Sequence, residues 1–142
     1  TPTWSPDSSL LAFASNRNGN WDLFVMRPDG TEFRQITDGV GDHWLPAWSP
    51  DGSMLAFTGN RDGNWDIFTI RPDGSELQQV VTHPASDSEP VWSPDGSVLA
   101  FARKQAGLSY ELMMVELSNG KVSHGNVDGF PTDWFEPTKN SG

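Results

Sequence analysis

Short apolar runs alternate with turn-forming residues along this chain, and the pattern is clearest between positions 46 and 81. The run 54–58 is apolar at nearly every position, which indicates a strand buried on both faces. The run 65–70 follows a glycine-containing hairpin loop, and the alternating, more polar run 76–81 indicates a half-exposed outer strand. Together with the short segment 46–48, these runs predict four antiparallel strands joined by tight turns.

The same pattern recurs with a constant period of 44 residues. Trp-Ser-Pro begins at Trp4, Trp48 and Trp92, and residues 4–37 are identical to residues 48–81 at 21 of 34 positions. A period of this size indicates copies of one supersecondary unit, which stack to bury a common core. Four antiparallel strands per unit, graded from apolar to polar, are typical of a propeller blade. We therefore predict an all-β chain folded as a β-propeller with three blades.

The repeat also predicts where each blade lies. We expect one partial propeller domain over residues 1–142, and the third copy diverges most, since 103–109 replaces the Asn-rich hairpin. A degenerate fourth copy of the Trp-Ser-Pro strand indicates a closing strand near the C-terminus. The expected segments are blade 1 at about 4–43, blade 2 at about 44–87, blade 3 at about 88–128 and the closing strand at 129–137.

Composition narrows the partners and the chemistry. The chain has 19 Asp and Glu against 9 Lys and Arg, a net charge of -10 that repels phosphate backbones and anionic lipid surfaces. We therefore expect no nucleic acid partner and no membrane insertion. No cysteine is present, so thiolate metal sites and disulfides are excluded. No Gly-x-Ser-x-Gly or His-Glu-x-x-His motif occurs, and we predict no catalytic residues.

The repeated motifs resemble those of TolB-type (WD40-like) β-propellers. The resemblance rests on Pro-Ala-Trp-Ser-Pro-Asp-Gly at 46–52, Leu-Ala-Phe at 55–57, Asn-Arg-Asp-Gly-Asn-Trp-Asp-Ile-Phe at 60–68 and Pro-Asp-Gly at 72–74. Similar repeats occur in the propeller domains of tricorn-like and oligopeptidase-like proteins. The resemblance therefore implies the fold strongly and the function weakly, because such propellers host unrelated roles.

For function, the resemblance implies a non-enzymatic, extracytoplasmic bacterial module that presents loops and a channel mouth to partner proteins, in the periplasm or outside the cell. Two alternatives stay open, a substrate-gating propeller of a larger serine peptidase and a carbohydrate- or metal-dependent lyase. A purely architectural role is a further alternative.

Three blades do not close a ring within one chain, because a propeller needs at least about four. An isolated half-ring would expose two apolar blade faces, more than soluble monomers usually tolerate. The sequence therefore indicates either a fragment of a longer propeller, as the initial Thr1 suggests, or two copies that assemble head to tail. We expect self-association into a six-bladed ring, the blade number that the TolB-type resemblance implies.

The candidate binding residues are Asp42, His43 and Trp44, a group that is not repeated. They precede an inner strand and should lie at the mouth of the central channel, where an exposed Trp beside an Asp suits peptide contact. The alternative is that Trp44 packs between two blades.

Other polar groups favour structural roles. Asn and Asp alternate around a glycine in two hairpins, as in calcium loops, but the loops have too few carboxylates, so we predict no cofactor and keep calcium as an alternative. The Asp that follows each Ser-Pro indicates a turn rule, and the histidines indicate no metal site because their expected radii differ. These residues are Asn16, Asn18, Asn20, Asp22, Asn60, Asp62, Asn64 and Asp66; Asp7, Asp51 and Asp95; and His43, His83 and His124.

Overall fold

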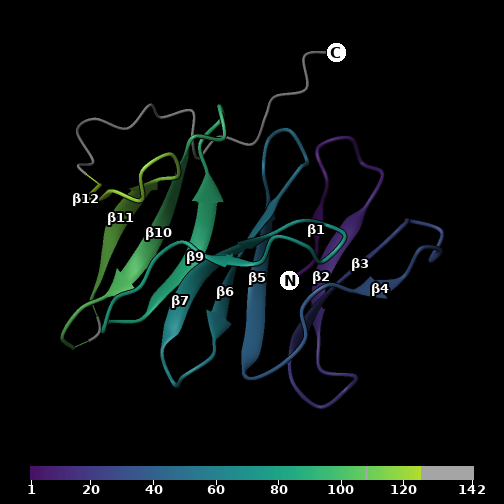
Figure 1. The fold of residues 1–142 in the computed structure, drawn as a ribbon, viewed down its shortest axis with the longest axis horizontal. Coiled ribbons are helices and arrows are strands. Elements are labelled where there is room, and N and C mark those ends of the chain that lie inside the picture. The colour runs from purple at the N-terminus through teal and green to yellow at the C-terminus, as the bar shows by residue number, and fades with distance from the viewer. Residues whose placement is uncertain (108, 126–142) are drawn as a thin grey trace.

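The computed structural model describes residues 1–107 and 109–125, and the expected closing strand at 129–137 lies outside this part of the chain. The described residues form three four-stranded antiparallel sheets, each made of four strands that are consecutive in the sequence. Figure 1 shows the sheets side by side in chain order. The prediction of an all-β chain with four-stranded antiparallel blades is therefore confirmed. Within these residues, no helix is long and apolar enough to span a membrane.

Each blade is one sheet. Blade 1 contains β1 (Thr3–Trp4), β2 (Leu11–Ser15), β3 (Asp22–Met26) and β4 (Arg34–Gln35). Blade 2 contains β5 (Asp42–Trp48), β6 (Leu55–Asn60), β7 (Trp65–Ile70) and β8 (Gln78–Gln79). Blade 3 contains β9 (Asp87–Trp92), β10 (Val98–Lys104), β11 (Tyr110–Glu116) and β12 (Val122–His124).

The Ser-Pro-Asp segment forms the same turn in every blade. In blade 2, the Ser49 hydroxyl donates to Oδ1 of Asp51 over 2.6 Å, and the Ser53 amide donates to the same oxygen over 3.0 Å. These bonds lower the pKa of Asp51 to about 2, with the Ser49 hydroxyl as the largest cause. Asp7 and Asp95 make the equivalent bonds, so the structural role predicted for this repeated aspartate is confirmed.

The inner strands of blades 2 and 3, β5 and β9, are longer and less regular than the sequence indicates. β5 extends from Asp42 to Trp48, and its register with β6 shifts at a bulge that contains Leu45 and Pro46. Leu45 has a φ of 55°, and its repeat equivalent Glu89 has a φ of 58° at the same bulge in β9. Such backbone is uncommon for residues other than glycine, and it costs about 1–3 kcal/mol. Proline has no amide proton and is tolerated at such a bulge. The strand β5 therefore continues through Pro46.

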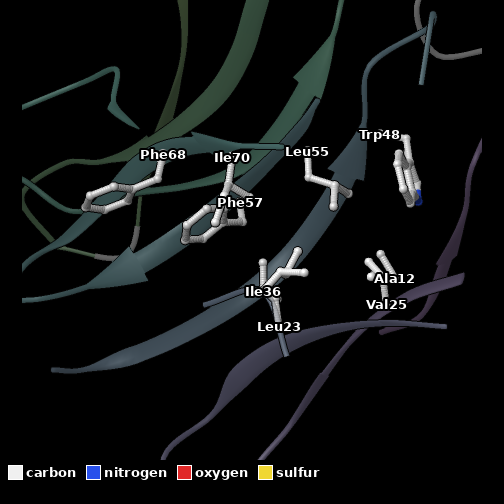
Figure 2. Close-up of a cluster of buried hydrophobic side chains, with 9 residues drawn as sticks. All are labelled: Ala12, Leu23, Val25, Ile36, Trp48, Leu55, Phe57, Phe68 and Ile70. Carbon is white, nitrogen blue, oxygen red and sulfur yellow. The ribbon is translucent and has the colours of Figure 1, made fainter. Parts of the chain in front are cut away.

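Apolar side chains fill the space between neighbouring blades. In Figure 2, side chains of blade 1 and blade 2 point toward one another across the first interface. Full burial of one such side chain contributes roughly 1.5–3 kcal/mol. The first interface contains Ala12, Leu23, Val25 and Ile36 from blade 1 and Trp48, Leu55, Phe57, Phe68 and Ile70 from blade 2. The second contains Ala56, Ile67 and Val81 from blade 2 and Leu99, Phe101, Met113 and Val115 from blade 3.

The repeated tryptophans tie neighbouring inner strands together. The indole Nε1 of Trp48 donates to the carbonyl of Thr3 over 3.2 Å, and that of Trp92 donates to the carbonyl of Ala47 over 3.0 Å. Each bond joins the first strand of one blade to the first strand of the preceding blade. β1 contacts β5 and β5 contacts β9, which places the first strand of each blade nearest the axis.

Candidate functional site

A buried polar link joins blades 1 and 2 near the start of the inner strand β5. Nδ1 of His43 lies 3.1 Å from Oδ1 of Asp22, and both side chains are buried. Thr37 donates its hydroxyl to the same carboxylate oxygen over 3.0 Å, and Gln35 donates its amide to the other oxygen over 2.8 Å. Asp22 therefore bonds side chains of its own blade and of the next blade.

The equivalent positions in blade 3 have different chemistry, and they form an ion pair within that blade, between β9 and β10. Asp87 takes the place of His43, and Arg103 takes the place of Gly59. The Arg103 guanidinium donates from Nε and an NH2 group to the two oxygens of Asp87, each over 2.8 Å. Burial raises the pKa of the neighbouring Asp66 carboxyl, and the charge of Asp87 adds to that shift.

The predicted binding group Asp42, His43 and Trp44 divides into separate roles. Oδ1 of Asp42 accepts a hydrogen bond from the backbone amide of Trp21 over 3.0 Å, so this carboxylate joins blade 2 to blade 1. His43 is buried in the interface between blades 1 and 2, where it bonds Asp22, and its side chain is not exposed to solvent. Trp44 is half-buried and keeps part of its surface available.

Trp44 packs in the first blade interface, at the end where β5 begins. Its ring lies against that of Trp21 in blade 1, with centroids 4.3 Å apart and planes inclined at 33°. This confirms that Trp44 packs between blades. Its indole Nε1 is buried and has no hydrogen-bond partner among the described residues. An unpaired buried donor costs about 1–3 kcal/mol, and such atoms call for an explanation in a native structure.

A pocket of about 400 Å³ lies at the same end of the second blade interface, which joins blades 2 and 3. This volume is within the range of small-ligand pockets. The pocket lies where β5 and β9 begin and where the hairpins β6–β7 and β10–β11 turn. Its main lining residues are Trp44 and Trp65 of blade 2 and Ser86, Ser88, Lys104 and Tyr110 of blade 3.

The repeat explains why the pocket exists. Trp65 is the equivalent of Trp21, and Ser88 is the equivalent of Trp44, each 44 residues later. The position whose indole covers Trp21 in the first interface therefore carries only a hydroxymethyl group in the second. Sequence reasoning missed Trp65, Ser88 and Lys104, although the replacement of Trp44 by Ser88 was a visible signal in the aligned repeats.

A larger cavity of about 530 Å³ lies at the opposite end of the same interface and has a counterpart in the first interface. Pro50 and Asp51 line both cavities, once as members of the later blade and once as members of the earlier blade. Trp48 in one cavity corresponds to Trp92 in the other. Because this cavity recurs with the Ser-Pro-Asp turn, it is a feature of blade stacking.

The remaining polar candidates make structural hydrogen bonds. Asn64 donates to the carbonyl of His83 over 2.7 Å, and Oδ1 of Asn60 accepts from the Gly63 amide over 2.8 Å. His124 in β12 bonds Glu111. Among the described residues, no group of three His, Cys, Asp or Glu side chains is arranged to hold a metal ion. Calcium in the Asn loops stays an untested alternative.

Comparison with known proteins decides the family. The family model of the TolB beta propeller domain matches residues 1–133. The chain belongs to this family. The Tol-Pal system protein TolB of Wolbachia pipientis subsp. Culex pipiens is 44% identical over 39 residues, which are 28% of this chain and 9% of that protein. The chain therefore spans only a small part of the length of this curated TolB relative.

Solved TolB-type propellers have the same fold. The putative TolB from Agrobacterium tumefaciens superposes with a TM-score of 0.77 at 26% identity, over 85% of this chain and 46% of that one. Two further matches support the fold alone. The AtxE2 isopeptidase matches at a TM-score of 0.72 and 14% identity, over 89% of this chain and 29% of that one. Oligogalacturonate lyase from Vibrio parahaemolyticus matches at 0.66 and 17%, over 85% and 37%.

Proposed function

We propose that this TolB-type propeller is a non-enzymatic protein-interaction module, located in the periplasm or outside the cell, that completes its ring by self-association. The similarity to Tol-Pal system proteins supports a partner-binding role and this location. The buried polar side chains support the same role, since His43 and Asp22 link blades 1 and 2, and Asp87 is paired with Arg103 within blade 3. The channel mouth at Trp44 is the proposed surface for a partner protein.

One observation carries the self-association. Trp4 is 53% exposed, whereas its repeat equivalent Trp48 is 9% exposed against the preceding blade. Leu11 and Phe13 on the same face are half-buried, whereas the corresponding side chains of blade 2 are fully buried. The first blade therefore presents the type of face that packs against a preceding blade.

The third blade presents the complementary type of face. Leu112 is only half-buried, whereas its equivalent Ile67 is fully buried against blade 3. In both internal interfaces, a face of the Ile67 type packs against a face of the Phe57 type in the next blade. Two copies joined head to tail by such contacts make a closed ring of six blades, because three blades from each chain complete the circle.

The solution mass tests this proposal. We expect size-exclusion chromatography with light scattering to give about 31 kDa, twice the 15.6 kDa of one chain. Trp4→Glu should return the mass to that of one chain, because it places a charge in the new interface. Val40→Glu is the matched control, since Val40 is 74% exposed in a loop between blades. A wild-type mass of one chain, or a dimer that Trp4→Glu leaves intact, would refute ring completion by this face.

Two other functions share the same fold. A substrate-gating propeller of a larger serine peptidase is supported by the fold of the AtxE2 isopeptidase, and a lyase by that of oligogalacturonate lyase. A nucleophile motif in a longer gene would favour the peptidase. Retention of a divalent metal through dialysis would favour the lyase.

A further inference from the structure

The pocket between blades 2 and 3 is the space that a missing aromatic ring leaves in the repeat. At the first interface, the indole of Trp44 covers Trp21 at a centroid distance of 4.3 Å. At the second interface, Trp65 and Ser88 both line the pocket, and no aromatic ring of residues 1–107 or 109–125 stacks on Trp65. The backbone frame at the two positions is the same, since Trp44 and Ser88 precede equivalent bulges in β5 and β9. The pocket therefore has one built aromatic wall and an open position for a second ring.

The lining restricts the chemistry of an occupant. Trp44, Trp65 and Tyr110 contribute three aromatic rings to the lining, beside Leu45 and Thr58. Aromatic rings prefer offset or tilted packing at centroid separations of about 4.5–7 Å. The hydroxyls of Ser86 and Ser88 add small polar groups at the inner strand. These features favour a planar aromatic side chain over a branched aliphatic one.

Lys104 adds a positive charge to this pocket. Its side chain is exposed, and no ion pair with it is recorded among the described residues, whereas the adjacent Arg103 is paired with Asp87. The Lys104 ammonium thus places a positive charge at an aromatic pocket, in a chain whose net charge is -10. It favours an occupant whose aromatic ring lies next to a carboxylate.

We propose that this pocket binds an aromatic side chain of a partner polypeptide, with a neighbouring carboxylate of that partner facing Lys104. The ring would lie on Trp65 as Trp44 lies on Trp21. This proposal deepens the protein-interaction function and rests on it. It does not depend on ring completion, because every lining residue belongs to blades 2 and 3 of one chain.

The proposal is tested with N-acetyl-L-tryptophan as the probe and ligand-observed saturation-transfer NMR as the measurement. We expect this probe to bind more tightly than N-acetyl-L-tryptophanamide, which lacks the carboxylate, and N-acetyl-L-leucine, which lacks the ring. Lys104→Gln should weaken binding of the carboxylate probe about two- to fivefold and leave the amide probe unchanged. Equal binding of the tryptophan and leucine probes would overturn the proposal.

Ser88→Trp is the decisive variant, because it restores the indole that the first interface has. We expect it to abolish probe binding and to raise the melting temperature. Ser123→Trp on the exposed outer strand β12 is the matched control and should bind the probe as the wild type does. If Ser88→Trp does not fold, Trp65→Ala decides, with an expected loss of about tenfold in affinity. Unchanged affinity in a folded Ser88→Trp or in Trp65→Ala would refute the pocket as the site.

The two proposals fail separately. If the protein has the mass of one chain and binds the aromatic probe, the pocket proposal is supported and the ring proposal is refuted. If the protein is a dimer and shows no preference for the aromatic probe, the ring proposal is supported and the pocket proposal is refuted.

Discussion

Replacing Arg103 by methionine removes one partner of the buried ion pair between β9 and β10. The Asp87 side chain is 0% exposed and that of Arg103 is 9% exposed, and two bonds of 2.8 Å join them. Removal of one partner from such a pair costs about 3–5 kcal/mol, because the remaining charge is buried without compensation. Here the remaining carboxylate also lies near Asp66, whose pKa its charge already helps to raise. Since domains of this size are stable by about 5–15 kcal/mol, Arg103→Met should remove about a fifth or more of the total.

The double variant Asp87→Leu with Arg103→Met replaces both charged side chains of the ion pair by apolar side chains, so no buried charge remains unpaired. Apolar groups of similar volume often replace a buried ion pair without loss, so we expect the double variant to be within about 2 kcal/mol of the wild type. Urea unfolding followed by tryptophan fluorescence gives the free energy of unfolding for the three proteins. A cost below about 1 kcal/mol for Arg103→Met, or a double variant no more stable than the single one, would contradict this reasoning.

Two further predictions concern the repeated turn and the repeated tryptophan. Trp92→Phe removes the bond from Nε1 to the Ala47 carbonyl and should lower the free energy of unfolding in urea by about 0.5–1.5 kcal/mol. Trp44→Phe is the control and should cost less, because Nε1 of Trp44 has no hydrogen-bond partner among the described residues. The folded-state pKa of Asp51, about 2 against an ordinary 3.8, means that its hydrogen bonds stabilise the fold above pH 3.8 and that this contribution is lost as the pH falls toward 2. Asp51→Asn should therefore flatten the fall of the melting temperature between pH 4 and pH 2, with Asp62→Asn in the exposed hairpin as the control; an unchanged acid slope would contradict the assignment.

Local sequence rules account for most strands and turns. The Ser-Pro-Asp turns and the apolar runs of β6 and β7 follow from residue types alone. The outer strand was expected over 76–81, but β8 has only the residues Gln78–Gln79, and Glu76 has a φ of 54°. Strands at a sheet edge have one neighbour instead of two, so propensity defines their ends poorly.

The candidate site was predictable only in part. Trp44 was predicted to be a binding residue at the channel mouth, with packing between blades as the alternative. Its contact with Trp21 spans two blades and is not encoded by local spacing. The pairing of Asp22 with His43 has the same origin, since the two residues are 21 positions apart and meet only when the blades stack.

The sequence by itself determined the repeat, the four-stranded blade and the identity of the turns, because these depend on periodicity and on neighbours within a few residues. The tertiary structure alone decided which repeated positions are buried, which polar groups join the blades and where a pocket remains. The physical reason is that these properties arise between blades, where equivalent positions face different partners. Trp44 meets Trp21, whereas Ser88 leaves Trp65 uncovered, and one substitution in a repeat thus becomes a cavity only after the blades stack.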